Sequence, residues 1–290
     1  MQPLKNITGG TAGLEEHNIM KTRIIAAAIL LPLLLVVVLA LPKLVTAIVF
    51  GAAAAIAAYE LLYATGLVRH VRLVVYSMVM AFLTSLWSYY GAAHLLGLIG
   101  VLAFFALLSG EMMISHIKLS FDKVACCLAA GFMVPYLLTS LVRIHVMASG
   151  RHFILMPFIM AFMSDTGAYF IGKFFGHHKL APVISPKKTI EGVFGGVVFA
   201  VLGMLIYAVV LRYAFHFDVN YLYAVLYGVL GSIGAVFGDL SFSVIKRQTG
   251  IKDYGNLIPG HGGILDRFDS MIVVGPLAEI LLLTIPMAVI

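Results

Sequence analysis

Long apolar runs recur along almost the whole chain, and each is roughly the 20 residues that a helix needs to cross the hydrocarbon of a bilayer. Backbone polar groups find no water in that hydrocarbon, so only helices or closed barrels can span it. The runs are continuous and rich in Leu, Ala and Val, which is typical of helices. The sequence therefore predicts an all-α, polytopic membrane protein.

The composition agrees with a membrane protein and argues against a nucleic-acid binder. Hydrophobic residues make up 62% of the chain and charged residues 11%, whereas a soluble domain carries about 25% charged residues. The net charge of +6 comes from basic residues that lie between the apolar runs. Membrane topology explains that charge, and we expect no nucleic-acid partner.

We predict about nine membrane spans, at residues 23–41, 43–65, 73–90, 92–116, 122–148, 153–175, 191–214, 220–245 and 267–289. With a cytosolic N-terminus, all lysines and arginines fall on the cytosolic side except Lys43, Arg143, Arg151 and Arg212. Such a bias over short loops is a strong indication of orientation. We expect a multi-pass protein of a bacterial inner (cytoplasmic) membrane, with its active site facing the cytosol.

The chain divides by composition into three parts. Residues 1–19 form a polar N-terminal extension, residues 20–150 hold the N-terminal membrane helices, and residues 151–290 hold the C-terminal membrane helices with the cytosolic catalytic loops. Small residues at helical spacing, such as Gly228, Gly231 and Gly238, predict close helix packing. The alternative is that they leave room for part of a lipid.

Two acidic residues lie within apolar runs, where a charge is costly and indicates a functional site. Asp239 comes seven residues before Lys246, and Asp165 comes eight residues before Lys173. At about 1.5 Å per residue, both lie roughly 10 Å below the cytosolic edge. We therefore predict that both belong to the cytosolic half of the protein.

Asp266 and Asp269 open the last apolar run and share one helical face, because they are three residues apart. Stabilisation of the helix N-terminus alone explains such a pair as well. Because the preceding and last helices join on the cytosolic side, we expect Asp239 to lie near both. Carboxylates without histidine or thiolate suit Mg²⁺. The alternative is a cluster neutralised by Arg267 and Lys246 alone.

Two cytosolic loops carry groups suited to phosphate. Residues 246–263 combine Lys246, Arg247 and Lys252 with glycines that let backbone N–H groups approach an anion. His261 in the same loop could bind phosphate or only order the turn. Residues 184–192 supply Ser185, Thr189 and the pair Lys187 and Lys188, which suit a phosphate monoester or a triphosphate. Anchoring by positive charge is the alternative for both loops.

The last loop resembles the phosphatidate cytidylyltransferase (CDP-diacylglycerol synthase) family. The matching residues are Ser243, Lys246, Arg247, Lys252, Asp253, Gly255, Pro259, His261, Gly262, Gly263, Asp266, Arg267 and Asp269. The segments at residues 164–169 and 185–192 also resemble family segments, so that the likeness covers about residues 160–270.

The resemblance implies that CTP and phosphatidic acid react to give CDP-diacylglycerol and pyrophosphate. It also implies that the enzyme is a homodimer embedded in membrane lipid. It implies a divalent metal, Mg²⁺, with room for K⁺ in the same site. The assignments follow: Asp239, Asp266 and Asp269 hold metal and act in catalysis with Lys246. Substrate contacts are assigned to Asp165, Ser185, Lys187, Lys188, Arg247, Lys252, His261, Gly262, Gly263 and Arg267.

Other functions remain open on the residues alone. A CTP-dependent polyprenol or phytol kinase would share the membrane bundle, the nucleotide and the metal. A transporter could also bury Asp165 and Asp239, but it would place acidic residues along a path on both sides of the membrane. The predicted outer loops contain little beyond Asp218. Cytidylyl transfer is therefore our preferred hypothesis.

Overall fold

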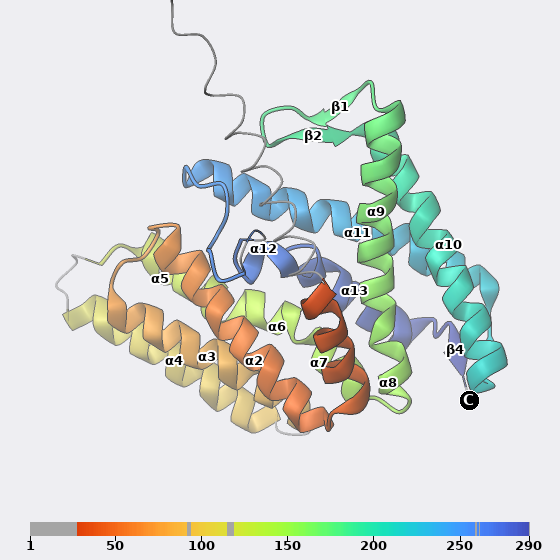
Figure 1. Ribbon diagram of the computed structural model, residues 1–290. Coiled ribbons are helices and arrows are strands. Elements are labelled where there is room, and N and C mark those ends of the chain that lie inside the picture. Colours follow the sequence, from red (N-terminus) through yellow and green to blue (C-terminus); the bar gives the residue numbers. More distant parts are fainter. Residues whose placement is uncertain (1–27, 92–93, 115–118, 259, 261, 290) are drawn as a thin grey trace, which may run out of the picture.

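The computed structural model describes residues 28–91, 94–114, 119–258, 260 and 262–289. Residues 1–27, which include the predicted polar extension, and His261 lie outside the described part. Within it, the chain forms a bundle of helices with two small two-stranded sheets (Figure 1). The all-α prediction is confirmed for these residues.

The helices and strands are η1 (Val36–Ala40), α2 (Lys43–Tyr59), η2 (Glu60–Ala64), α3 (Val71–Tyr90), α4 (His94–Ile114), α5 (Phe121–Leu128), η3 (Ala129–Met133), α6 (Val134–Leu138), α7 (Ser140–Val146), α8 (Gly150–Phe153), α9 (Leu155–Phe175), β1 (Lys179–Ala181), β2 (Ser185–Thr189), α10 (Ile190–Phe215), β3 (Asp218–Val219), α11 (Tyr221–Gln248), α12 (Leu265–Phe268), α13 (Met271–Thr284) and β4 (Ala288–Val289). The three η segments are π-helical turns within or at the end of longer helices.

Seven of the described helices are long and apolar enough to cross a membrane. They are Lys43–Ala64, Val71–Tyr90, Leu95–Ile114, Phe121–Val146, Gly150–Phe175, Ile190–Phe215 and Tyr221–Gln248. The first and last of the nine predicted spans correspond to shorter helices, Ala28–Leu39 and Met271–Thr284. The count of nine and the cytosolic N-terminus therefore stay predictions.

Side-chain caps fix where two of the long helices begin. The Thr189 hydroxyl accepts a hydrogen bond from the backbone N–H of Gly192 at 3.1 Å, which starts α10. The Asn220 side chain accepts from the first backbone N–H groups of α11 in the same way. The first N–H groups of a helix have no partner within the helix, so such residues are favoured there. The Thr189 cap sets the end of α10 next to a predicted catalytic loop, whereas the Asn220 cap sets the opposite end of α11.

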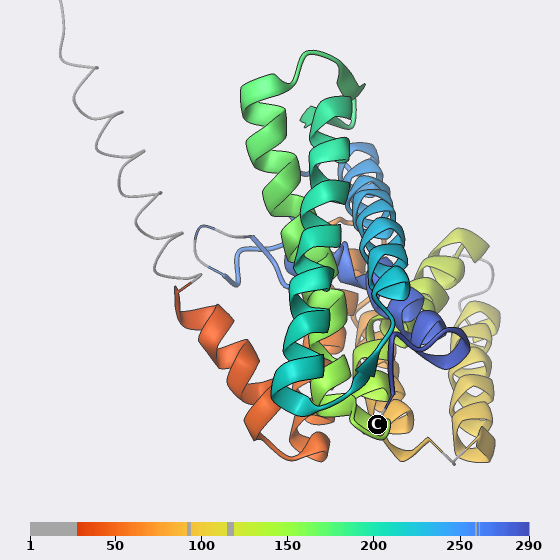
Figure 2. The same cartoon turned by 90° about the vertical axis from the view of Figure 1, so that its right-hand side faces the viewer.

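Glycines bring α9, α10 and α11 into close contact, and Figure 2 shows the three helices side by side. A Cβ atom at Gly195 of α10 would lie 2.4 Å from the side chain of Ile171 in α9. A Cβ atom at Gly228 of α11 would lie 2.5 Å from the Val201 backbone in α10, and one at Gly231 would lie 2.5 Å from a Met160 atom in α9. No side chain fits in such gaps, so the predicted packing role of the small residues is confirmed.

The two sheets lie at opposite ends of this helix group (Figure 1). Strands β1 and β2 form an antiparallel hairpin that joins α9 to α10. Strands β3 and β4 pair the α10–α11 connection with the chain end near Val289. The hairpin therefore marks the predicted cytosolic end of the bundle.

The last helix packs back against the N-terminal half of the chain. Arg143 of α7 donates two hydrogen bonds to Glu279 of α13, each 2.7 Å long. Helix α13 also contacts α6. The predicted division near residue 150 stays a prediction, but the two parts are joined by this ion pair.

Candidate active site

The two predicted catalytic loops meet in the structure. Lys188, at the end of the β1–β2 hairpin, forms an ion pair with Asp239 of α11, with 2.6 Å between its Nζ and a carboxylate oxygen. The Arg247 guanidinium at the end of α11 donates to the backbone carbonyl of Ile184 at 3.2 Å. Residues 184–192 and 246–263 thus form two adjacent walls.

The absence of a side chain at Gly238 lets α11 pack against the backbone at Asp269. A Cβ atom at Gly238 would lie 2.7 Å from the backbone carbonyl oxygen of Asp269. Asp269 lies within electrostatic range of both Asp239 and Asp165. Asp165 in turn lies within range of Lys188 and Arg267. Three predicted acidic residues and two predicted basic residues therefore share one region.

Asp266 lies in a separate and nearly closed environment. Its side chain is 2% exposed, and its Oδ1 accepts a hydrogen bond from Lys246 Nζ at 2.9 Å. Its Oδ2 accepts from the backbone N–H groups of Tyr254 and Gly263, at 2.7 and 3.0 Å. Both oxygens are thus engaged by protein donors. Asp266 therefore ties residues 254 and 263 to the start of α12.

Tyr254 joins the same loop to α11 through a buried hydrogen bond. Its ring is buried, and its hydroxyl donates to the backbone carbonyl of Phe242 at 2.9 Å. Burial, reinforced by the charges of Asp266 and Asp269, raises the pKa of Tyr254 above its ordinary value. The phenol therefore stays protonated and keeps its role as a donor. The Lys246 ammonium lies 5.4 Å from the centre of the same ring.

The residues assigned to substrate contacts lie mostly on the open side of these walls. Lys187, Lys252, Arg247 and Arg267 are exposed, and Ser185 is half-buried. Gly262 has a positive φ of 84°, which glycine tolerates. The Gly263 N–H is already used by Asp266. This N–H of the predicted phosphate cradle therefore holds the conformation of the loop.

One acidic residue that the sequence patterns did not single out also contacts this loop. Glu60 lies at the end of α2 and is 3% exposed. Its carboxylate accepts hydrogen bonds from the backbone N–H groups of Ile264 and Leu265, at 3.0 and 2.8 Å. The signal was present, since an acidic residue within an apolar run is costly. Among acidic residues in apolar runs, only Asp165 and Asp239 were singled out from the sequence.

The carboxylates suit a magnesium ion only if the substrate supplies further ligands. Among the described residues, no group of three or more His, Cys, Asp or Glu side chains is placed to hold a metal. Mg²⁺ is often bound by one or two carboxylates together with phosphate oxygens and water. Asp239 is 29% exposed at its side chain and lies near Asp269. These two residues fit that pattern, whereas both oxygens of Asp266 are engaged.

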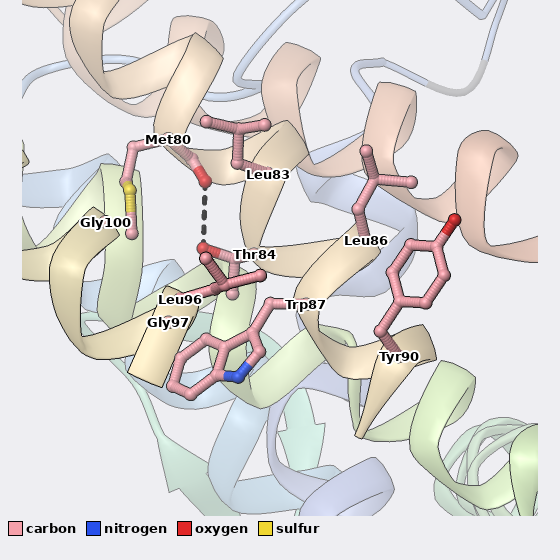
Figure 3. A pocket seen from close by; sticks show the side chains of 9 residues that line it. All are labelled: Met80, Leu83, Thr84, Leu86, Trp87, Tyr90, Leu96, Gly97 and Gly100. Atoms are coloured by element: carbon pink, nitrogen blue, oxygen red, sulfur yellow. Dashed lines mark hydrogen bonds between the residues drawn. The ribbon is translucent and has the colours of Figure 1, made fainter. Parts of the chain in front are cut away.

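An apolar cavity of about 590 Å³ lies elsewhere, between α3 and α4 (Figure 3). Figure 3 shows Met80, Leu83 and Trp87 along its wall, with the Thr84 hydroxyl bonded to the Met80 carbonyl. The residues that line the cavity carry no charge. The cavity therefore offers no charged side chain to a phosphate.

The chain is similar to known proteins over most of its length. Residues 21–285 match the model of the "Cytidylyltransferase family". A phosphatidate cytidylyltransferase from Staphylococcus haemolyticus is 42% identical over 185 residues, which cover 62% of this chain and 66% of that protein. One from Staphylococcus epidermidis is 38% identical over 190 residues, 63% of this chain and 68% of the relative. The matched segments thus span about two thirds of each relative. With nearly its whole length matched by the family model, the chain belongs to the cytidylyltransferase family.

Proposed function

We propose that this protein transfers the cytidylyl group of CTP to phosphatidic acid, giving CDP-diacylglycerol and pyrophosphate. Family membership and the name shared by the relatives support this function. The geometry supports it too, because the acidic and basic groups gather where helix ends meet two hydrophilic loops. A nucleotide from water and a headgroup from the bilayer can both reach such a place.

The reaction needs little proton chemistry. A phosphatidate oxygen attacks the α-phosphorus of CTP and forms the new P–O bond. The bond from the α-phosphorus to the bridging oxygen breaks, and its electron pair leaves with pyrophosphate. Since the nucleophile is already anionic, no strong base is required. The protein has to align the two substrates and offset their negative charge.

The basic residues at the opening can perform that task. Arg267 and Lys188 lie within electrostatic range of Asp165. Lys187, which precedes Lys188, and Lys252, in the last loop, are both exposed. Ser243 donates a hydrogen bond to Asp239 at 3.1 Å and so orients that carboxylate. We assign Lys188, Arg247, Lys252 and Arg267 to phosphate groups. Lys246 keeps Asp266 and the loop in place.

The grouping of carboxylates supports a metal. Asp165, Asp239 and Asp269 lie within electrostatic range of one another. A cation placed among them would offset their mutual repulsion and the charge of the substrate phosphates. We propose that Asp239 and Asp269 hold Mg²⁺ on the CTP phosphates, with K⁺ as a further ion. A bound Mg²⁺ would stabilise charge on the α-phosphorus oxygens and on pyrophosphate.

The observation that carries the proposal is that Asp239 lies within electrostatic range of Asp269 and forms an ion pair with Lys188 of the hairpin. The test uses CTP labelled with ³²P at the α-phosphorus, phosphatidic acid and Mg²⁺. Label should enter lipid with the wild type and with Asp218→Asn, a matched control at β3, but at least about a hundredfold more slowly with Asp239→Asn. Lipid labelled only from γ-³²P CTP would instead indicate a kinase.

The location and assembly belong to the same proposal. We propose a homodimer in a bacterial inner membrane, with the site facing the cytosol, on the basis of the family resemblance and the loop charges. Lys252→Cys should react with an impermeant thiol reagent in inside-out vesicles and not in right-side-out vesicles. Reaction only in right-side-out vesicles would reverse the orientation. Cross-linking of the purified protein tests the dimer.

A further inference from the structure

Glu60 is an acidic residue of the N-terminal half that reaches the last catalytic loop. It lies at the junction of α2 and η2, more than two hundred positions away in sequence from the residues it contacts. It is 3% exposed. The salt bridges found among the described residues include none to Glu60. Its charge is met by backbone donors.

Those donors belong to the turn that leads into α12. Ile264 N–H donates to Glu60 Oε1 at 3.0 Å, and Leu265 N–H donates to Oε2 at 2.8 Å. The preceding N–H, that of Gly263, donates to Asp266. Three successive backbone donors are therefore shared between two carboxylates, one from each end of the chain. Backbone N–H groups at a helix start otherwise lack partners.

The glycines of the loop are shaped around the same carboxylate. A Cβ atom at Gly255 would lie 2.6 Å from Glu60 Oε1, and one at Gly263 would lie 2.4 Å from it. Neither gap admits a methyl group. The backbone at residues 255 and 263 therefore packs directly against the Glu60 side chain.

We propose that Glu60 is a positioning residue for the catalytic loop: it holds the start of α12 so that Asp266 stays bonded to Lys246 and the loop, and Asp269 stays near Asp239. This inference rests on the proposed function for its effect on turnover. Glu60 lies within electrostatic range of Asp266, so its charge also acts on the Asp266–Lys246 pair. It contacts the loop and not the reacting atoms.

The test compares Glu60→Gln and Glu60→Ala with Glu111→Gln, a matched change at a peripheral acid that pairs with Arg72. Gln keeps the side-chain volume and one acceptor, and Ala removes both acceptors. We expect kcat to fall about tenfold in Glu60→Gln and further in Glu60→Ala, since each lost bond leaves a buried N–H unsatisfied. KM for CTP should stay within about threefold, and Glu111→Gln should match the wild type.

Amide hydrogen exchange of the full chain in detergent gives a readout that is independent of activity. In Glu60→Gln, residues 262–268 should exchange about tenfold faster, while α10 keeps its wild-type protection. Gly263→Ala should lower kcat in the wild type and have no added effect in Glu60→Ala, where the clashing carboxylate is absent.

Three results would overturn the proposal: kcat of Glu60→Ala within about twofold of the wild type, unchanged exchange at residues 262–268, or faster exchange spread equally over α10. If Glu60→Ala does not fold, Glu60→Gln decides on the same readouts. A wild type that never labels lipid refutes the proposed function instead, and the exchange result still tests the positioning role.

Discussion

The ion pair between Lys246 and Asp266 gives the sharpest test of how the loop is held. Their charged atoms are 2.9 Å apart, and the side chains are 11% and 2% exposed. At that distance and an effective dielectric constant of about 20, the attraction is about 6 kcal/mol before the cost of desolvation. Removal of one partner leaves the other charge buried alone, which costs about 3 to 5 kcal/mol.

The perturbation is a double-mutant cycle of Asp266→Asn and Lys246→Met. The Asn oxygen can still accept from the Tyr254 and Gly263 N–H groups, so that variant keeps the bonds to the loop and removes the charge and the acceptor that face Lys246. We expect each single variant to lower the free energy of unfolding by about 3 to 5 kcal/mol. The double variant should come within about 1 kcal/mol of the wild type, because no charge is left unpaired.

Denaturant titration of the purified protein in detergent measures the cycle, with circular dichroism as the signal. A coupling energy above about 2 kcal/mol supports the argument. Single variants as stable as the wild type, or effects that simply add in the double variant, would contradict it. Turnover of the double variant then separates the roles. A stable but inactive protein shows that the charges act in the reaction as well as in the fold.

Three further predictions concern packing, a distant ion pair and pH. Gly238→Ala should lower turnover at least about tenfold in the lipid-labelling assay, because the added Cβ would lie 2.7 Å from the Asp269 carbonyl oxygen. The control is Gly110→Ala, whose added Cβ would meet nothing within 4 Å. Arg143→Met removes the ion pair between α7 and α13, so it should cost about 3 kcal/mol in denaturant titration and leave turnover per folded molecule within about twofold. Burial raises the pKa of Tyr254, so the protonated phenol stabilises the fold below about pH 10, and this stabilisation is lost as pH rises further. Tyr254→Phe should lower the free energy of unfolding at neutral pH by about 1 to 2 kcal/mol and should reduce the loss of stability at alkaline pH, as measured by unfolding at a series of pH values.

Local patterns were enough to predict several residues that the structure brings together at the candidate site. Asp239 and Asp165 stood out because acidic residues are costly in apolar runs, and the two loops stood out by their charge. Helical packing followed from the spacing of Gly228, Gly231 and Gly238, since small residues at that period leave one face open. These signals depend on neighbours in sequence, which explains why they could be read without a structure.

Contacts between distant segments could not be predicted in the same way. Nothing near Lys188 in sequence indicates that it pairs with Asp239, and nothing near Glu60 points to residues 264 and 265. Both contacts depend on how the helices pack, and helix order in a bundle does not follow from hydropathy. The length of the last helix was also misjudged by pattern, because α13 ends at Thr284, and Pro286 follows within two residues.

The acidic residues of the site differ in what surrounds them, and that difference indicates a division of roles. Asp266 is 2% exposed at its side chain and is bonded to Lys246 and two backbone donors, so a change of partner would require the loop to open. Asp239 is 29% exposed and is paired with Lys188, a lysine on a hairpin. An ammonium at that position can be exchanged for another cation at much lower cost, and Lys188 would then be free to contact a phosphate. The buried carboxylate is therefore suited to holding the fold of the loop, and the exposed one to the cation that arrives with the nucleotide.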